Sequence, residues 1–125
     1  MIFDTDILIW VQRGNRDAAR LIDQADSREI SILSYMELLQ GARDKKQHQV
    51  SKAFLRDFDF ITLPLSENIG HRAAVYVEEY ALARGMRAAD ALVAATAVEN
   101  GLPLCTANRK HFEPIADLDL HVFVP

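Results

Sequence analysis

The chain has 125 residues, of which 50% are hydrophobic and 26% are charged, a composition that excludes disordered and fibrous proteins. Its length predicts a single domain over residues 1–125 with one real hydrophobic core. Acidic residues exceed basic ones by 18 to 14, and the resulting net charge of -4 argues against a protein that coats nucleic acid through bulk positive charge. The single cysteine, Cys105, cannot form an internal disulfide, so the fold does not depend on an oxidising compartment.

The first residues do not resemble a targeting segment. Acidic residues at positions 4 and 6 stand where a signal peptide would carry basic residues and then an apolar run. The most apolar stretch, residues 91–98, is far shorter than the roughly 20 residues that span a bilayer. We therefore expect a soluble cytoplasmic protein without a membrane partner.

Short apolar runs alternate with helical hydrophobic stripes along the chain. In chain order the patterns predict a strand over residues 1–5, a helix over 17–26, a strand over 29–33, helices over 34–42 and 44–58, a strand over 59–65, helices over 66–84 and 87–100, and strands over 104–106 and 121–124. Gly85 and Gly101 follow the last two helices, as C-terminal caps do. Strands separated by helices require crossover connections, so the predicted class is α/β: three layers, with a mainly parallel sheet of about five strands and helices on both faces.

Acidic residues stand where predicted strands end and where the following helices begin. Asp4 and Asp6 follow the first strand. Glu37 lies in the first turn of the predicted helix after the second strand, and Asp90 opens an otherwise uncharged helical run. Ligands of such folds bind beyond the carboxyl ends of the strands, so we expect these carboxylates to meet there. Closely spaced carboxylates repel one another until a cation or a proton intervenes, and the pattern therefore favours a metal site.

Each of these carboxylates also has a structural explanation. Asp4 and Asp6 could start a turn or cap a helix. Ser34 and Glu37 match the S-x-x-E capping box. Asp90 lies near a helix N-terminus, where the helix dipole favours a negative charge. These explanations account for each residue alone but not for the convergence of three chain segments on one rim.

Four segments of the sequence resemble the signature motifs of PIN domains, and more narrowly those of VapC-type toxin ribonucleases of type II toxin–antitoxin pairs. The segments are IFDTDIL at residues 2–8, SYMELLQG at 34–41, DALVAA at 90–95 and TANRKHF at 106–112. They occur in the family's order and cover essentially the whole chain. The resemblance implies a PIN-like fold and a Mg²⁺- or Mn²⁺-dependent endoribonuclease. Its implied partners are an RNA substrate, a second copy in a homodimer and a cognate antitoxin, which can form a hetero-oligomer with the toxin.

The resemblance also implies roles for individual residues. By motif position, Asp4 and Asp90 would be the principal metal ligands, and Glu37 would be the third catalytic acid, binding the metal directly or through water. Hard carboxylate oxygens suit Mg²⁺ or Mn²⁺, whereas one cysteine and scattered histidines cannot assemble a zinc or iron–sulfur site. A metal-activated water would cleave RNA to leave a 5′-phosphate and a 3′-hydroxyl.

Two positions depart from the family pattern. Asp6 stands where Asn or Ser is usual, and either Asn108 or His111 stands where an acidic residue is frequent. Without a fourth acid near Asn108, we expect one ion in the free protein and a second, if any, only with RNA; an inward-facing Asp6 would strengthen that second site. Thr106 and Asn108 are expected to form hydrogen bonds around the site, although Asn108 could instead cap the next helix. None of the histidines is expected to be catalytic.

Two other functions stay open from the sequence. Asp4-Thr-Asp6 matches the D-x-D motif of haloacid-dehalogenase-type phosphatases. That chemistry also needs a lysine and a downstream acidic pair, which the uncharged run after Asp90 does not supply. The second alternative is a non-catalytic PIN-like binding module, whose hallmark would be the loss of one of the core acids. Asp4, Glu37 and Asp90 are all present, so we expect an enzyme.

Overall fold

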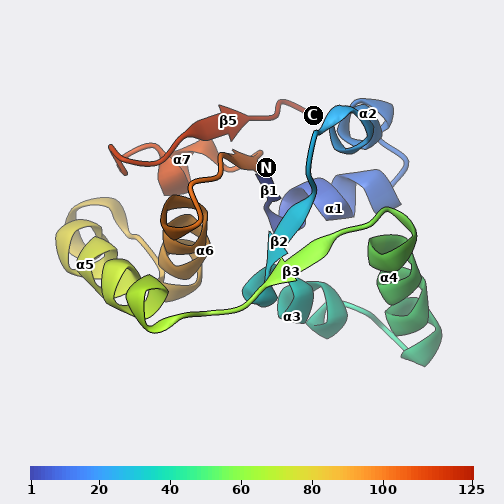
Figure 1. The fold of residues 1–125 in the computed structure, drawn as a ribbon, viewed down its shortest axis with the longest axis horizontal. Coiled ribbons are helices and arrows are strands. Elements are labelled where there is room, and N and C mark those ends of the chain that lie inside the picture. The colour runs from blue at the N-terminus through green and yellow to red at the C-terminus, as the bar shows by residue number, and fades with distance from the viewer.

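Five short strands form the centre of the protein, and seven helices surround them (Figure 1). The computed structural model describes residues 1–125. The strands are β1 (Ile2–Phe3), β2 (Glu29–Ser31), β3 (Ile61–Leu63), β4 (Leu104–Thr106) and β5 (Leu120–Val122). They form one sheet in the order β3-β2-β1-β4-β5, and every neighbouring pair is parallel. The predicted α/β class is therefore confirmed, and the sheet is wholly rather than mainly parallel.

Two of the seven helices, α1 (Thr5–Gln12) and α7 (Arg109–Phe112), are not among the helices predicted from the sequence. The other helices are α2 (Arg16–Gln24), α3 (Ile32–Gln40), α4 (Lys45–Asp57), α5 (Glu67–Arg84) and α6 (Ala88–Glu99). The apolar run at the centre of α1 has no clear polar side, and α7 comprises a single turn. Neither segment offers the hydrophobic periodicity on which helix prediction depends. None of the seven helices is both long enough and apolar enough to cross a membrane.

Helices cover both faces of the sheet. Ile2 and Leu104 contribute to a hydrophobic cluster with α5, α6 and α7, whereas Phe3, Ile30 and Cys105 contribute to a second cluster with α1, α2 and α4. Successive strand residues point to opposite faces, which explains why neighbours such as Ile2 and Phe3 enter different clusters. Figure 1 shows the two groups of helices on opposite sides of the strands. This arrangement confirms the predicted three layers.

The central strand β1 lies where the order of the sheet changes direction. β2 and β3 continue the sheet on one side of β1, and β4 and β5 continue it on the other. The connections leaving such a strand and its neighbour diverge, which opens a crevice beyond their carboxyl ends. Residues that directly follow β1 and β4 therefore lie at the place where parallel α/β folds bind ligands.

The helix after β2 begins earlier than the sequence pattern predicts. Ser31 is its N-cap, and the Ser31 hydroxyl accepts a hydrogen bond of 3.1 Å from the backbone N–H of Leu33. Ser34 instead lies inside α3, where its hydroxyl is buried without a hydrogen-bond partner. The predicted capping box of Ser34 and Glu37 is therefore wrong. Glu37 lies in the second turn of α3, so helix capping does not explain it.

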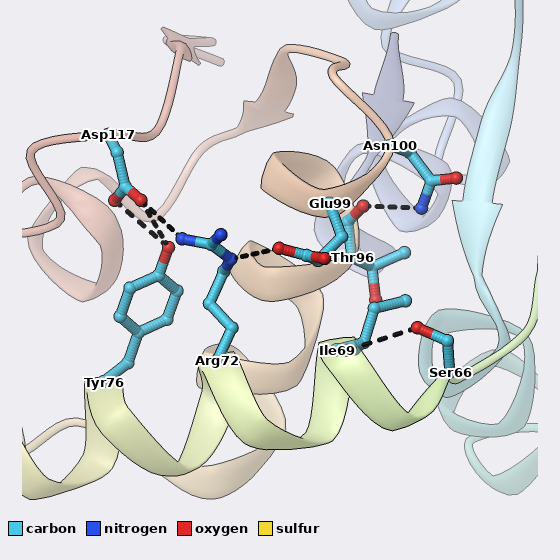
Figure 2. Close-up of polar contacts among 8 residues, drawn as sticks. All are labelled: Ser66, Ile69, Arg72, Tyr76, Thr96, Glu99, Asn100 and Asp117. Atoms are coloured by element: carbon cyan, nitrogen blue, oxygen red, sulfur yellow. Dashed lines mark hydrogen bonds and ion pairs between the residues drawn. The ribbon is translucent and has the colours of Figure 1, made fainter.

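A polar network fastens α5 to α6 and to the segment before β5 (Figure 2). The Arg72 guanidinium donates to the carboxylates of Glu99 and Asp117. The Tyr76 hydroxyl, at 3.1 Å, also donates to Asp117. Glu99 is the last residue of α6, and Asp90 lies in the first turn of the same helix. The network thus holds in place the helix that carries Asp90.

Candidate active site

Asp4 lies at the centre of the site, directly after β1. It is the N-cap of α1, and its Oδ1 accepts a hydrogen bond of 2.8 Å from the backbone N–H of Thr5. Its Oδ2 accepts a second bond, also of 2.8 Å, from the Thr106 hydroxyl at the end of β4. The pairing of β1 with β4 places these two residues side by side, and the side chain of Asp4 is almost completely buried.

Asp6 turns toward the same strand end. Its Oδ2 accepts hydrogen bonds from the backbone N–H of Ala107 at 2.9 Å and from the Thr106 hydroxyl at 3.3 Å. Because that hydroxyl carries one hydrogen, Asp4 and Asp6 compete for it. The second oxygen of Asp6, Oδ1, is buried and has no hydrogen-bond partner. A buried carboxylate oxygen without a partner is costly, and a cation would compensate it.

Asp90 reaches the site from α6. This helix precedes β4 and runs back across the sheet, so its first turn lies near the carboxyl ends of the strands. The side chain of Asp90 is half-buried, and Asp90 Oδ2 lies 3.1 Å from Nδ1 of His111 in α7. Arg87, just before α6, adds a positive charge nearby.

Glu37 reaches the site from α3. Its Oε1 accepts a hydrogen bond of 3.1 Å from the Thr5 hydroxyl, which links it to the N-terminus of α1. The Glu37 side chain is exposed and borders a cleft of about 390 Å³ between α1, α3 and α4. Arg13 and Arg43 also line this cleft. A larger cavity of about 660 Å³ lies beside Arg72 on α5, but none of these acids borders it.

Burial favours the protonated form of the clustered carboxyl groups, and for Asp4 repulsion by neighbouring carboxylates adds to the effect. Burial, together with the negative charge of Asp6 and that of Asp90, raises the pKa of Asp4 to about 7, against the opposing hydrogen bond from Thr106. Burial also raises the pKa of Asp6 and that of Asp90. The interaction with His111 lowers both values and so offsets part of this increase. The thiol of Cys105 responds to the same field: burial, Asp6 and Asp4 raise its pKa to about 11, so it stays protonated.

The structure draws some predicted residues together and leaves others apart. Asp4, Asp6 and Thr106 share hydrogen bonds, and Asp90 is close enough to affect the pKa of Asp4. The Asn108 side chain is exposed and makes no capping hydrogen bond to α7; only its backbone N–H, donating to the Thr106 hydroxyl at 3.0 Å, joins the network. No three His, Cys, Asp or Glu side chains converge as a closed set of metal ligands.

The chemistry of the site nevertheless fits a hard divalent cation. The available donors are carboxylate oxygens, which Mg²⁺ and Mn²⁺ prefer. One of these oxygens, Asp6 Oδ1, is buried without a partner. Burial and the neighbouring charge of Asp6 raise the pKa of Asp4, so a bound cation would stabilise its ionised form. A third acid, Glu37, is exposed beside the cleft and accepts a hydrogen bond from the Thr5 hydroxyl.

Two polar side chains at the site were not assigned a role from the sequence. Thr5 bridges Asp4 and Glu37, using its backbone N–H and its hydroxyl. His111 contacts Asp90. Thr5 lies between the two acids of the first motif, which is a usable signal. The sequence marks His111 only as a departure from the family pattern, and its proximity to Asp90 depends on how α7 packs against α6.

Comparison with known proteins places the chain in a family. Residues 1–118 match the PIN domain family model. Ribonuclease VapC1 of Methanocaldococcus jannaschii is 27% identical over 98% of this chain and 86% of its own length. A toxin-antitoxin complex from Klebsiella pneumoniae contains a chain that is 30% identical, with a TM-score of 0.79, over 94% of this chain and 93% of that one. A chain of VapBC2 from Rickettsia felis, 22% identical and with a TM-score of 0.79, covers 99% of this chain and 100% of its own and shares the fold.

These matches confirm the resemblance found in the sequence and exclude the phosphatase alternative. The family model spans nearly the whole chain, and the relatives cover most of their own lengths. The chain belongs to the PIN domain family, and the proteins it resembles are of the VapC type.

Proposed function

We propose that this chain is a VapC-type endoribonuclease that requires a divalent metal ion and acts as the toxin of a toxin–antitoxin pair. The observation that carries the proposal is the burial of Asp4 beside Asp6 and Asp90 at the switch point of the sheet, where the buried Asp6 Oδ1 has no hydrogen-bond partner. The similarity to a ribonuclease over nearly the whole chain supports the choice of RNA as substrate.

Asp4 and Asp90 would hold Mg²⁺ or Mn²⁺, and Glu37 would bind the ion directly or through water. When bound, the ion lowers the pKa of a coordinated water and polarises the scissile phosphate. The Thr106 hydroxyl and the Thr5 backbone N–H hold the Asp4 carboxylate in one orientation. Asp6 adds negative charge beside Asp4 and keeps one oxygen free, so it is a further candidate ligand.

Cations around the acidic cluster supply local binding to RNA. Arg13 and Arg43 border the cleft that contains Glu37, and Arg87 lies beside Asp90. The net charge of the chain is -4, so the affinity for RNA must come from such local contacts rather than from the overall charge. The cleft between α1, α3 and α4 is bordered by Glu37, and we propose it as the path of one RNA strand.

An antitoxin would silence the enzyme by covering the same rim. Two of the solved relatives are described as a toxin-antitoxin complex and as VapBC2. An arginine of the antitoxin could pair with the clustered carboxylates through both of its terminal nitrogens. We also propose that the chain forms a homodimer. Binding of the antitoxin to this homodimer would give a toxin–antitoxin hetero-oligomer.

Substitution of the core acids tests the enzymatic proposal. Asp4→Asn and Asp90→Asn retain side-chain volume but remove a ligand charge, so RNA cleavage in Mg²⁺ should fall at least about a hundredfold. Asp119→Asn is the matched control, because Asp119 is exposed and lies before the amino end of the edge strand β5, whereas the site lies beyond the carboxyl ends of the strands. Cleavage of a labelled RNA is measured for all three variants with Mg²⁺ and with a chelator.

Each outcome of this experiment has a clear meaning. Undiminished cleavage in the chelator or in Asp4→Asn would contradict the metal-dependent site. An absence of cleavage by the folded wild type on RNAs of varied sequence would favour the non-catalytic PIN-like module. Wild-type activity in Asp119→Asn would show that the losses in the other variants are local.

A further inference from the structure

α7 holds His111 at the edge of the acidic cluster. The short helix follows β4 and Thr106, and its last residue, Phe112, is completely buried in the cluster formed with α5 and α6. Glu113, directly after α7, pairs with Arg84 of α5 at 3.1 Å and with Arg109 at 3.1 Å. The buried Phe112 and the ion pair of Glu113 with Arg84 therefore hold α7 against α5 and α6, and the pair of Glu113 with Arg109 lies within the α7 turn itself.

The packing of α7 places the His111 imidazole beside one oxygen of Asp90. His111 Nδ1 lies 3.1 Å from Asp90 Oδ2, and no other basic side chain lies within 4 Å of the Asp90 carboxylate. A neutral imidazole protonated at Nδ1 can donate to that oxygen. The contact occupies Oδ2 and leaves Oδ1 free for another partner.

We propose that His111 is a positioning residue, which holds Asp90 Oδ2 through Nδ1 and so orients Oδ1 for the divalent ion. This inference rests on the proposed function, because it assumes that Asp90 is a ligand. Carboxylate ligands are commonly held by hydrogen bonds from neighbouring side chains. A carboxylate that is already held in one orientation loses less conformational freedom when the metal binds. His111 thus takes part in metal binding without touching the ion.

The chain contains a matched control for this contact. His121 Nε2 lies 3.2 Å from Asp119 Oδ1, and the His121 side chain is 51% exposed, compared with 52% for His111. The second pair lies at β5 and includes none of the site residues. A general effect of losing a surface His–Asp pair should therefore appear equally in both positions.

The experiment measures Mn²⁺ binding to the RNA-free protein by calorimetric titration, with no activity assay. His111→Phe keeps a ring but removes the donor, so the Kd for Mn²⁺ should rise about 10- to 100-fold. His111→Asn places a donor nitrogen on Cγ, as Nδ1 is, and should retain most of the affinity. His111→Gln places the nitrogen one bond further out and should not. His121→Phe should bind Mn²⁺ as the wild type does.

Failure of the inference can be told apart from failure of the proposed function. Wild-type affinity in a folded His111→Phe variant, with binding lost in Asp4→Asn, would overturn the role of His111 and leave the metal site intact. A wild-type protein that binds no Mn²⁺ would overturn both. If His111→Phe does not fold, equal affinities of the Asn and Gln variants would still refute a contact through Nδ1. Circular dichroism melting establishes folding for each variant.

Discussion

Burial of the Asp4 carboxyl group links the stability of the protein to pH near neutrality. Its pKa is about 7 in the folded protein, because burial and the charge of Asp6 disfavour ionisation. In the unfolded chain the same group ionises near 3.8. Between these two values the folded state binds a proton that the unfolded state has released, so the free energy of unfolding falls as pH rises.

The first prediction at the residue scale follows from this difference. In a chelator, Asp4 should lower the free energy of unfolding by up to about 1.4 kcal/mol for each pH unit between roughly 4 and 7. Asp4→Asn cannot ionise and should lose this part of the slope, so above pH 7 the variant should melt at a higher temperature than the wild type. Thermal unfolding from pH 4.5 to 8 measures both effects. Parallel profiles for the two proteins would contradict the buried position of Asp4.

The ends of the long helix α5 illustrate how single residues set an element. Ser66 caps its N-terminus by accepting a 3.2 Å hydrogen bond from the backbone N–H of Ile69. Gly85 ends it with a φ of 68°, the left-handed conformation that side chains with a Cβ disfavour. Gly70 lies inside the same helix, and a Cβ added there would meet no atom within 4 Å. The two glycines therefore have opposite effects on stability.

Exchanging each glycine for alanine is the prediction at the element scale. Gly85→Ala should lower the free energy of unfolding by about 1 to 2 kcal/mol, because alanine must adopt a left-handed φ. Gly70→Ala should raise it by up to about 1 kcal/mol, because alanine is the better residue in a helix interior. Urea unfolding of both variants provides the measurement. A loss of stability in Gly70→Ala would indicate that this face of α5 is packed against another surface, such as a second copy of the chain.

The site is a property of the whole molecule, because its acids come from three separate segments. Asp4 and Asp6 follow β1, Glu37 lies in α3 and Asp90 in α6. The polar network of Arg72 lies at the far end of α6 from Asp90, yet both depend on the same packing of α5 against α6. The proposed site therefore requires the complete fold rather than any one motif.

The prediction at the scale of the whole molecule concerns the growth of cells that express the protein. Strong induction of the wild type should slow growth, whereas Asp4→Asn should permit normal growth at an equal level of folded protein. Co-expression of the cognate antitoxin should restore growth by covering the acidic rim. Growth curves, together with quantification of the protein, provide the test. Normal growth with abundant folded wild type would count against a toxin but not against a nuclease.

Local patterns in the sequence were sufficient for the α/β class and for most of the elements. The strand at 104–106 agrees with β4, and the helix at 66–84 agrees with α5 to within one residue. Both follow from features a few residues apart, namely apolar runs, a Ser cap and a C-terminal Gly. The same local reading placed acids after strands, and parallel topology then required these acids to share one edge.

Only the tertiary structure decided how the acids are held. The inward turn of Asp6 depends on its bond to Ala107, 101 residues away in sequence, and the link between Glu37 and Thr5 joins residues 32 apart. The contact of His111 with Asp90 depends on the burial of Phe112 against α6. No local pattern encodes such contacts, because they arise when the sheet pairs β1 with β4 and packs the helices on it. The sequence pattern therefore determined which acids lie at the carboxyl ends of the strands. Tertiary packing determined which of their atoms make contact.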